Sequence, residues 1–157
     1  MFAVLFNGCA KPNAAQTTKT VHCTISISCN AVIGNKQLNP AKADFIPSDG
    51  RILVQTETEC AAGETVYDVL RCACESHACS DNCRFCQNGG IQMEAAYTPA
   101  YGTYYVEGIH NLYEKDCGGR SGWLYTVNGE TASKGCSETI VQDGDVIEWV
   151  YTTDWNM

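Results

Sequence analysis

Eleven cysteines in a chain of 157 residues constrain the fold more than any other feature of this sequence. This usage is far above that of cytosolic proteins, and it indicates either a disulfide framework in an oxidising compartment or a metal site. Without Cys9, ten cysteines remain, an even number that is consistent with five disulfides. The candidates are Cys23, Cys29, Cys60, Cys72, Cys74, Cys79, Cys83, Cys86, Cys117 and Cys136. Disulfides are the favoured interpretation for an exported chain.

A metal site is the alternative. Four cysteines are separated by four, three and two residues, namely Cys74, Cys79, Cys83 and Cys86. This spacing approaches that of plant-type ferredoxins but differs from it by one residue at the centre, and an iron–sulfur cluster tolerates such a shift poorly. Cys83 and Cys86 with Cys72 and Cys74 would instead provide two close thiolate pairs, which suit tetrahedral zinc.

The first twenty residues differ in composition from the rest of the chain. The apolar run "MFAVLFNG" precedes Cys9, and the polar stretch "KPNAAQTTKT" that follows is typical of a flexible tether. This pattern is similar to the end of a bacterial lipoprotein signal, in which the cysteine is lipidated. A frayed apolar N-terminus or a truncated gene start is the alternative. Residues 21–157 are long enough for one domain with a single core.

Charge excludes several classes of partner. The chain has 18 acidic and 10 basic residues, a formal net charge of -8, and no cluster of Lys or Arg that could bind phosphates. We therefore expect no nucleic-acid partner, and membrane contact only through a lipid at Cys9. No run of 18 apolar residues occurs, which argues against a membrane-spanning helix.

Periodicity predicts two strands and a helix in the first half of the domain. "VHCTISISC", residues 21–29, alternates apolar and polar side chains, and "RILVQTETE", residues 51–59, follows a turn as its hairpin partner. Asn39 before Pro40 signals a short helical turn between them. "AAGETVYDVLRCACE", residues 61–75, has helical periodicity, with Thr65 and Asp68 placed as a capping box. Residues 75–90 then form a cysteine-rich loop without periodicity.

The second half is predicted to be strands and turns. The expected strands are residues 91–98, 103–114, 122–127 and 145–152. Asn128-Gly129 is a type I′ turn signal, and Asp143-Gly144 marks a second turn. Two strands, one helix and several further strands predict an α+β fold with one main helix across a mixed sheet. This is the order of elements in a β-grasp.

Four motifs carry a resemblance to a known family. "GETVYDVL", "YYVEGIHNLYEKDCG", "SGWLYTVNG" and "DGDVIEWVYT" occur in an order that resembles the transcobalamin-like C-terminal domain family. The resemblance implies a β-grasp fold, an extracellular location and similarity to the small domain of transcobalamin and intrinsic factor. In those carriers this domain covers one face of the corrin while a separate helical domain covers the other. A corrinoid such as cobalamin is therefore the implied ligand, and the cysteine-rich loop is an insertion.

The resemblance also bears on the cysteines. The family pattern has cysteines that match Cys23, Cys29, Cys74, Cys117 and Cys136, and a further one where this chain has Thr152. The partner of that missing cysteine is therefore left without its usual bridge. Independently of the family, Cys117 and Cys136 flank the hairpin "SGWLYTVNGE", so the pairing that the sequence favours is a bridge between its two ends.

Aromatic residues supply the candidate binding site. Tyr and Trp provide large contact areas with a polar tip, and the candidates are Trp123, Tyr125, Tyr104 and Tyr113. Strand alternation places Trp123 and Tyr125 on one side and Leu124 on the other, but period alone does not decide which side faces the core. By resemblance, Trp123 matches a tryptophan close to the ligand in the cobalamin carriers.

The chain has three histidines, and none of them is paired by sequence with a nucleophile, so we expect no enzyme. The predicted function is an extracellular or cell-surface binding module for a small ligand, without a resident cofactor. The alternatives are an adhesive domain that binds a surface protein, and a zinc or iron–sulfur protein that uses the cysteine-rich loop.

Overall fold

The computed structural model of the chain describes residues 19–77 and 90–155. The predicted lipidation site Cys9, the apolar start and tether, and the loop cysteines Cys79, Cys83 and Cys86 lie outside these residues. No helix in the described part is both long and apolar enough to cross a membrane.

The described residues form eight strands, one α-helix and two short 3-10 helices. In chain order they are β1 (Thr20–Ser28), η1 (Asn30–Val32), η2 (Pro40–Phe45), β2 (Arg51–Ala61), α1 (Val66–Ser76), β3 (Met93–Thr98), β4 (Thr103–Ile109), β5 (Leu112–Tyr113), β6 (Gly122–Val127), β7 (Glu130–Thr131) and β8 (Val146–Thr152). The order of two strands, a helix and further strands confirms the predicted α+β class.

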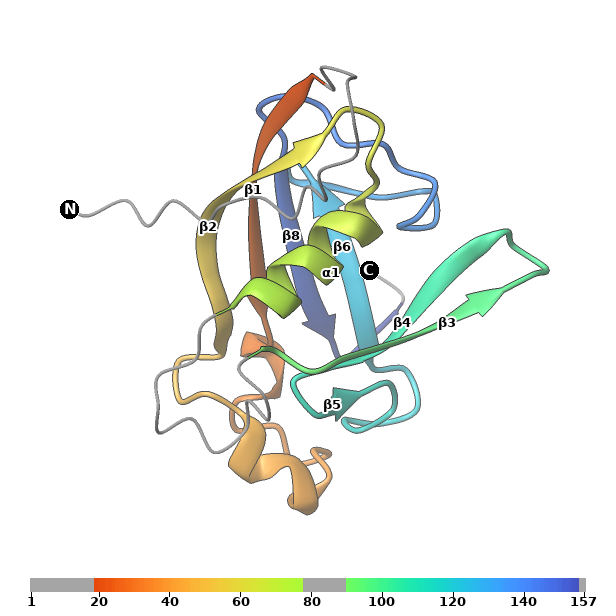
Figure 1. Cartoon of the computed structure of the whole chain (residues 1–157). Helices are drawn as coiled ribbons and strands as arrows, with labels where there is room; N and C mark the ends of the chain where they lie inside the picture. Colours follow the sequence, from red (N-terminus) through yellow and green to blue (C-terminus); the bar gives the residue numbers. More distant parts are fainter. Residues whose placement is uncertain (1–18, 78–89, 156–157) are drawn as a thin grey trace.

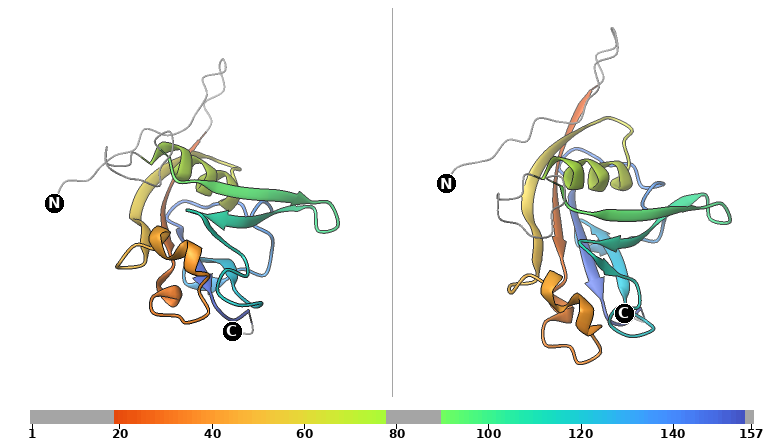
Figure 2. Two further views of the ribbon diagram at one scale, coloured as in Figure 1. Left: turned by 90° about the horizontal axis from the view of Figure 1, so that it is seen from below. Right: turned by 60° about the horizontal axis from the view of Figure 1, so that its bottom comes forward.

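The strands form two sheets. The larger has the order β2-β1-β8-β6-β7, and it is mixed because β1 and β8 run parallel while the other neighbours are antiparallel. The smaller sheet has the order β3-β4-β5. Figure 1 and Figure 2 show α1 and the β3–β4 hairpin on the same face of the larger sheet, where they cover different strands. The core therefore lies between the larger sheet and a second layer made of one helix and one hairpin.

The predicted strand alternation is confirmed in β1. Val21, Cys23, Ile25 and Ile27 are buried, whereas the residues between them are partly or fully exposed. β2 pairs with β1 in antiparallel register, with Val21 opposite Cys60. A strand with one buried face and one polar face fits a sheet that is covered by a helix on one side only.

The capping box at the start of α1 is also confirmed. The Thr65 hydroxyl oxygen accepts from the Asp68 backbone N–H at 3.3 Å, and an Asp68 carboxylate oxygen accepts from the Thr65 backbone N–H at 3.0 Å. These bonds satisfy two donors that a helix start leaves unpaired. The apolar face of the helix buries Val66, Val69, Leu70 and Cys74 against the sheet.

Most predicted strand boundaries differ from the structure by one or two residues, β7 was not predicted, and a turn accounts for the largest difference. The predicted strand 103–114 is two strands, β4 and β5, because His110 and Asn111 have positive φ angles of 54° and 62° and reverse the chain. The turn at Asn128-Gly129 is confirmed, with φ angles of 55° and 80° that suit a type I′ hairpin. The short helix η2 begins as predicted, with the Asn39 side chain accepting from the Ala41 backbone N–H.

Candidate functional site

A cavity of about 340 Å³ lies between the β3–β4 hairpin and the larger sheet. It is lined by Thr98, Tyr101, Thr103, Tyr104, Tyr105, Val106, Trp123, Leu124, Tyr125, Thr131, Ala132, Lys134, Gly135, Cys136, Trp149 and Trp155. These residues come from the end of β3 and the turn that follows it, from β4, β6 and β8, from the segment 131–136 after the hairpin turn, and from the chain just after β8. Seven of them are Trp or Tyr.

The floor of the cavity is a cross-strand aromatic group on β6 and β8. Tyr125 lies opposite Trp149 in the antiparallel register, with ring centroids 5.3 Å apart. Trp123 lies opposite Tyr151 and meets it edge to face at 5.2 Å. Such pairs stabilise neighbouring strands directly, and they hold the rings in defined orientations.

Hydrogen bonds anchor the polar tips of two of these rings. Trp123 donates from Nε1 to the Leu112 carbonyl oxygen at 2.9 Å. The Tyr125 hydroxyl donates to the Lys134 carbonyl oxygen at 2.7 Å and lies 2.8 Å from Thr139 Oγ1. Burial raises the pKa of Tyr125, so its hydroxyl stays neutral and keeps its proton for this bond. Trp149 differs, since its buried Nε1–H has no hydrogen-bond partner among the described residues.

The wall opposite the floor is built on β4. Tyr104 stacks face to face on Tyr67 of α1, with ring centroids 4.3 Å apart and an interplanar angle of 1°. The Ser137 hydroxyl accepts from the Tyr104 backbone N–H at 3.0 Å, and the Cys136 thiol donates to the Tyr104 carbonyl oxygen at 3.3 Å. These contacts join β4 to the segment after β7, so the wall and the rim are held together.

Gly135 permits this close approach. A Cβ atom at position 135 would overlap the side chain of Thr103, whose hydroxyl lies 2.8 Å from Ser137 Oγ. Glycine is the residue that lets two backbones meet at such a distance. The rim of the cavity therefore depends on the absence of a side chain at this position.

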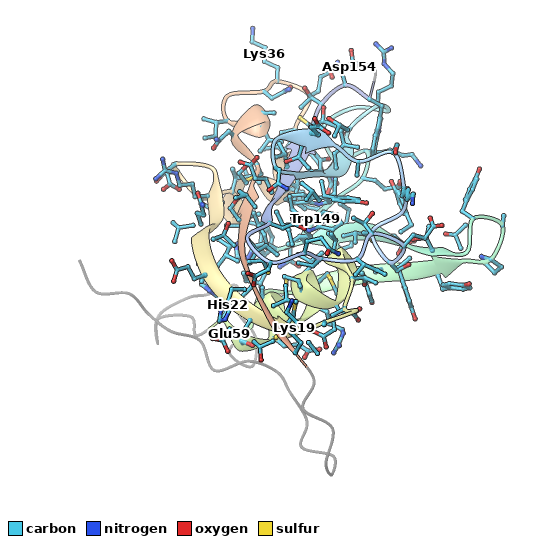
Figure 3. All side chains as sticks on the ribbon, turned by 90° about the horizontal axis from the view of Figure 1, so that it is seen from above. Lys19, His22, Lys36, Glu59, Trp149 and Asp154 are labelled. Atoms are coloured by element: carbon cyan, nitrogen blue, oxygen red, sulfur yellow. The ribbon has the colours of Figure 1, made fainter. Side chains whose placement is uncertain are left out.

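The lining has little capacity for acid–base chemistry. It contains no Asp, Glu or His, although the chain has 18 acidic residues, and its one charged side chain is Lys134. The three histidines lie elsewhere: His22 is exposed beside Glu59 (Figure 3), His77 ends α1, and His110 is buried at the turn after β4. The lining is thus largely apolar and aromatic, with a single cationic side chain.

The cavity brings together three of the four predicted binding residues. Trp123, Tyr125 and Tyr104 line it, and β6 turns its Trp123–Tyr125 face toward the core, since both residues are buried. Tyr113 lies elsewhere, with its ring 4.4 Å from Lys42 Nζ and its hydroxyl donating to Glu94 Oε1 at 2.6 Å. Tyr113 is therefore not part of the cavity.

Sequence reasoning missed Trp149 and the rim segment 131–136. Alternation in residues 146–152 places Trp149 with Ile147 and Tyr151, and all three are buried. That pattern was a usable signal for a core residue. Its place opposite Tyr125 depends on strand register, which short-range periodicity does not specify.

The described cysteines correct one expectation. Cys23, Cys29, Cys60, Cys74, Cys117 and Cys136 are buried free thiols, and Cys72 is in a disulfide. The Cys117–Cys136 bridge is therefore not present. β7 is only two residues long, so the chain leaves the hairpin after Thr131 and does not return along β6 toward Cys117. Cys117 instead packs beside Ser121, while Cys136 lies beneath Tyr104.

The metal alternative rests mainly on residues outside the described part. Of its four principal cysteines only Cys74 is described, and it is 2% exposed with a pKa that burial raises to about 12. Within residues 19–77 and 90–155, no group of three His, Cys, Asp or Glu side chains could hold a metal ion.

Comparison with known proteins gives a family match over part of the chain and a similar fold. Residues 89–153 match a family described as a domain of unknown function, DUF4430, over less than half of the chain. This segment runs from the end of the cysteine-rich loop to β8, and it contains most of the cavity. No curated protein has a significant match to the sequence.

Two solved structures are similar. The crystal structure of haptocorrin in complex with Cbi aligns with a TM-score of 0.56 at 16% identity, over 90% of this chain and 27% of haptocorrin. The chain thus has a transcobalamin-like fold and spans about a quarter of haptocorrin's length. The second is a "putative metal binding protein" from Ruminococcus gnavus, with a TM-score of 0.43 at 15% identity, over 84% of this chain and 96% of that one.

Proposed function

We propose that this protein is a non-enzymatic β-grasp binding module that captures a small, flat ligand in the aromatic cavity. The observation that carries the proposal is a cavity whose rings are held open by hydrogen bonds at Trp123 and Tyr125. A site whose walls are already in place loses little conformational freedom on binding, so more of the contact energy appears as affinity. The similarity to haptocorrin supports a binding role for this fold.

The size and charge of the cavity limit the ligand. Its volume of about 340 Å³ is at the low end of the range of roughly 300–1,000 Å³ for small-molecule sites. A corrinoid is our first candidate, and because it is larger than the cavity, only one edge would enter. The remainder would lie across the mouth beside the exposed Tyr101. The absence of carboxylates from the lining favours a neutral or anionic ligand.

An extracellular or cell-surface location is part of the proposal. The disulfide at Cys72 supports an oxidising compartment, because such bonds are rare in reducing cytosol. Lipid attachment at Cys9 would tether the domain through residues 10–20 and leave the cavity free to meet soluble ligands.

A protein-interaction role is the second candidate, and one observation favours it. The β3–β4 hairpin projects from the body of the molecule (Figure 1), and it carries Tyr97 and Tyr101 with 54% and 77% of their surface exposed. Exposed tyrosines are common anchors in protein interfaces. A surface protein that binds this hairpin would contact both tyrosines, whereas a ligand in the cavity would contact Tyr101 alone.

The two tyrosines therefore provide a matched test. Purified protein is titrated by calorimetry with cobinamide and cobalamin, and by fluorescence with N-phenyl-1-naphthylamine, a neutral apolar probe. We expect Tyr101→Ala to weaken binding about fivefold, because an aromatic contact is worth on the order of 1 kcal/mol. Tyr97→Ala is the control, since it is exposed on the same hairpin but does not line the cavity.

A variant that fills the cavity completes the experiment. Ala132→Trp places an indole where Ala132 lines the wall, and we expect it to abolish binding of every probe that enters. If the naphthylamine binds but neither corrinoid does, the corrinoid is not the ligand, and the cavity is still a binding site. No binding of any of the three at micromolar protein would contradict the proposed function.

A further inference from the structure

Two buried cysteines lie side by side on the core face of β1 and β2. Val21 is opposite Cys60 and Cys23 is opposite Thr58, so Cys23 and Cys60 occupy diagonal positions in the antiparallel ladder. Both side chains point into the core and are 4% and 9% exposed. Diagonal neighbours on one face of an antiparallel pair are about 7–8 Å apart, with their Cβ atoms somewhat closer.

The two thiols interact directly. Burial raises the pKa of Cys23 to about 12, and the next largest causes are the charge and hydrogen bond of the neighbouring Cys60 thiol. The effect on Cys60 is reciprocal: burial raises its pKa, while the hydrogen bond from Cys23 lowers it. The two thiols are therefore near neighbours in the core, consistent with their diagonal positions in the ladder.

The other free thiols have different neighbours. No cysteine affects the pKa of Cys29, Cys74, Cys117 or Cys136. Besides burial, the groups that shift these pKa values are carboxylates and backbone amides. The chain already contains one disulfide, at Cys72, so its cysteines are subject to oxidation.

We propose that Cys23 and Cys60 form a disulfide that fastens the edge strand β2 to β1. The bond forms by exchange with a low-molecular-weight or protein disulfide. The Cys23–Cys60 sulfur bond forms, the oxidant's sulfur–sulfur bond breaks, and the two thiol protons and two electrons pass to the oxidant as two new thiols. Bond formation requires the two sulfur atoms to approach to about 2.05 Å.

The timing of the reaction follows from burial. Only thiolates exchange with disulfides, and in the folded protein the Cys23 thiolate is scarce because of its raised pKa. During folding both thiols are exposed and ionise more readily, so the bond forms before the core closes. Once formed, it lies beneath α1 and is protected from reductants by the same burial. The disulfide would therefore hold β2, the edge strand, to β1, which is its only neighbour in the described sheet.

Peptide mapping tests the pairing directly. The full chain is refolded with a mixture of reduced and oxidised glutathione, alkylated in denaturant so that burial cannot hide a free thiol, and digested with trypsin without reduction. Cleavage after Lys19, Lys36, Arg51 and Arg71 puts Cys23 in peptide 20–36 and Cys60 in peptide 52–71. We expect these peptides as one linked species, two hydrogens lighter than their sum. The internal standard for oxidation is Cys72, which should remain unalkylated.

Three variants assign the bond within peptide 20–36, which also contains Cys29. The linked species should persist in Cys29→Ser and disappear in Cys23→Ser and in Cys60→Ser. Alkylation of both Cys23 and Cys60 in wild-type protein whose Cys72 is protected would overturn the proposal. So would a link that survives Cys23→Ser. The mapping of wild-type protein stands on its own if a serine variant fails to fold.

Discussion

The two halves of the core are packed with different kinds of side chain. On the helix side, β1, β2 and α1 bury mainly aliphatic residues and cysteines, such as Ile25, Val66 and Leu70. On the hairpin side, β6 and β8 bury aromatic rings, and Trp149 lies in the interior between the layers (Figure 3). The hairpin side also contains the cavity.

The difference shows how one small domain separates stability from binding. Aliphatic side chains have no polar atoms to satisfy, so they can adjust to fill space around α1. On the hairpin side, the rings of Trp123, Tyr125 and Tyr151 are held by hydrogen bonds from their polar tips to the backbone carbonyls of Leu112, Lys134 and Tyr113. They cannot collapse into the space between them without breaking those bonds. We therefore expect changes on the helix side to affect folding, and changes on the hairpin side to affect the cavity.

The largest effect is expected on the helix side. Leu70→Ala removes a fully buried side chain from α1, and it should lower the free energy of unfolding by about 3 kcal/mol through lost burial and an unfilled space. Urea unfolding measures the change. Naphthylamine binding to the folded fraction should be unaltered, and a matching loss of affinity would show that the two halves are coupled.

Gly135→Ala is the corresponding change on the hairpin side. The added methyl group meets Thr103, so β4 and the rim must separate, at a cost of about 2 kcal/mol typical of overpacking. Here both stability and probe binding should fall. Gly119→Ala is the control, because a Cβ there meets nothing within 4 Å and the residue has no positive φ. Equal affinities for the two variants would contradict the role of Gly135 at the rim.

Leu70 and Gly135 also show which features the sequence could predict. The capping box of α1 and the apolar face that contains Leu70 were predictable, because both depend on residues within a few positions of each other. The turn at Asn128-Gly129 was predictable for the same reason. No local pattern could show that Gly135 approaches Thr103, since the contact joins residues that are distant along the chain.

The candidate site was predicted only in part, because local patterns do not specify contacts between distant residues. Alternation correctly grouped Trp123 with Tyr125, but it left two opposite orientations of β6 equally allowed. The buried positions of both residues resolve this choice. The expected Cys117–Cys136 bridge assumed that a hairpin returns along its own strand, and the two-residue β7 shows that it does not. Strand register, which the sequence pattern does not specify, is what brings Trp149 and Tyr125 together.

A smaller effect is expected at Tyr125, which is both core residue and cavity wall. Tyr125→Phe retains the ring but removes the hydroxyl that bonds Lys134 and Thr139, so it should lower the free energy of unfolding by about 1 kcal/mol. Because the rim segment loses an anchor, amide hydrogen exchange should increase in residues 131–136. Unchanged exchange there would mean that the hydroxyl contributes to stability without holding the rim.

The smallest expected effect concerns pH, and it lies where the two halves meet. His77 ends α1 and His110 follows β4, and burial lowers the pKa of both, with the charge of His77 adding to the effect on His110. A histidine whose pKa is lower in the folded state binds fewer protons there than in the unfolded chain. Its contribution is therefore fully present above the unfolded pKa of about 6.5 and is lost as the pH falls below it.

Replacing the imidazole should flatten this dependence. Asn tolerates the positive φ at position 110, so His110→Asn keeps the turn and removes the group that resists protonation. Urea unfolding at pH 8 and at pH 5.5 should show a smaller loss of stability in this variant than in wild type. His22→Asn is the control, since His22 is exposed on β1 away from this boundary, and it should keep the wild-type difference. If all three proteins lose the same free energy of unfolding between pH 8 and pH 5.5, groups other than His110 cause the pH dependence. The boundary between the two halves would then not respond to acid.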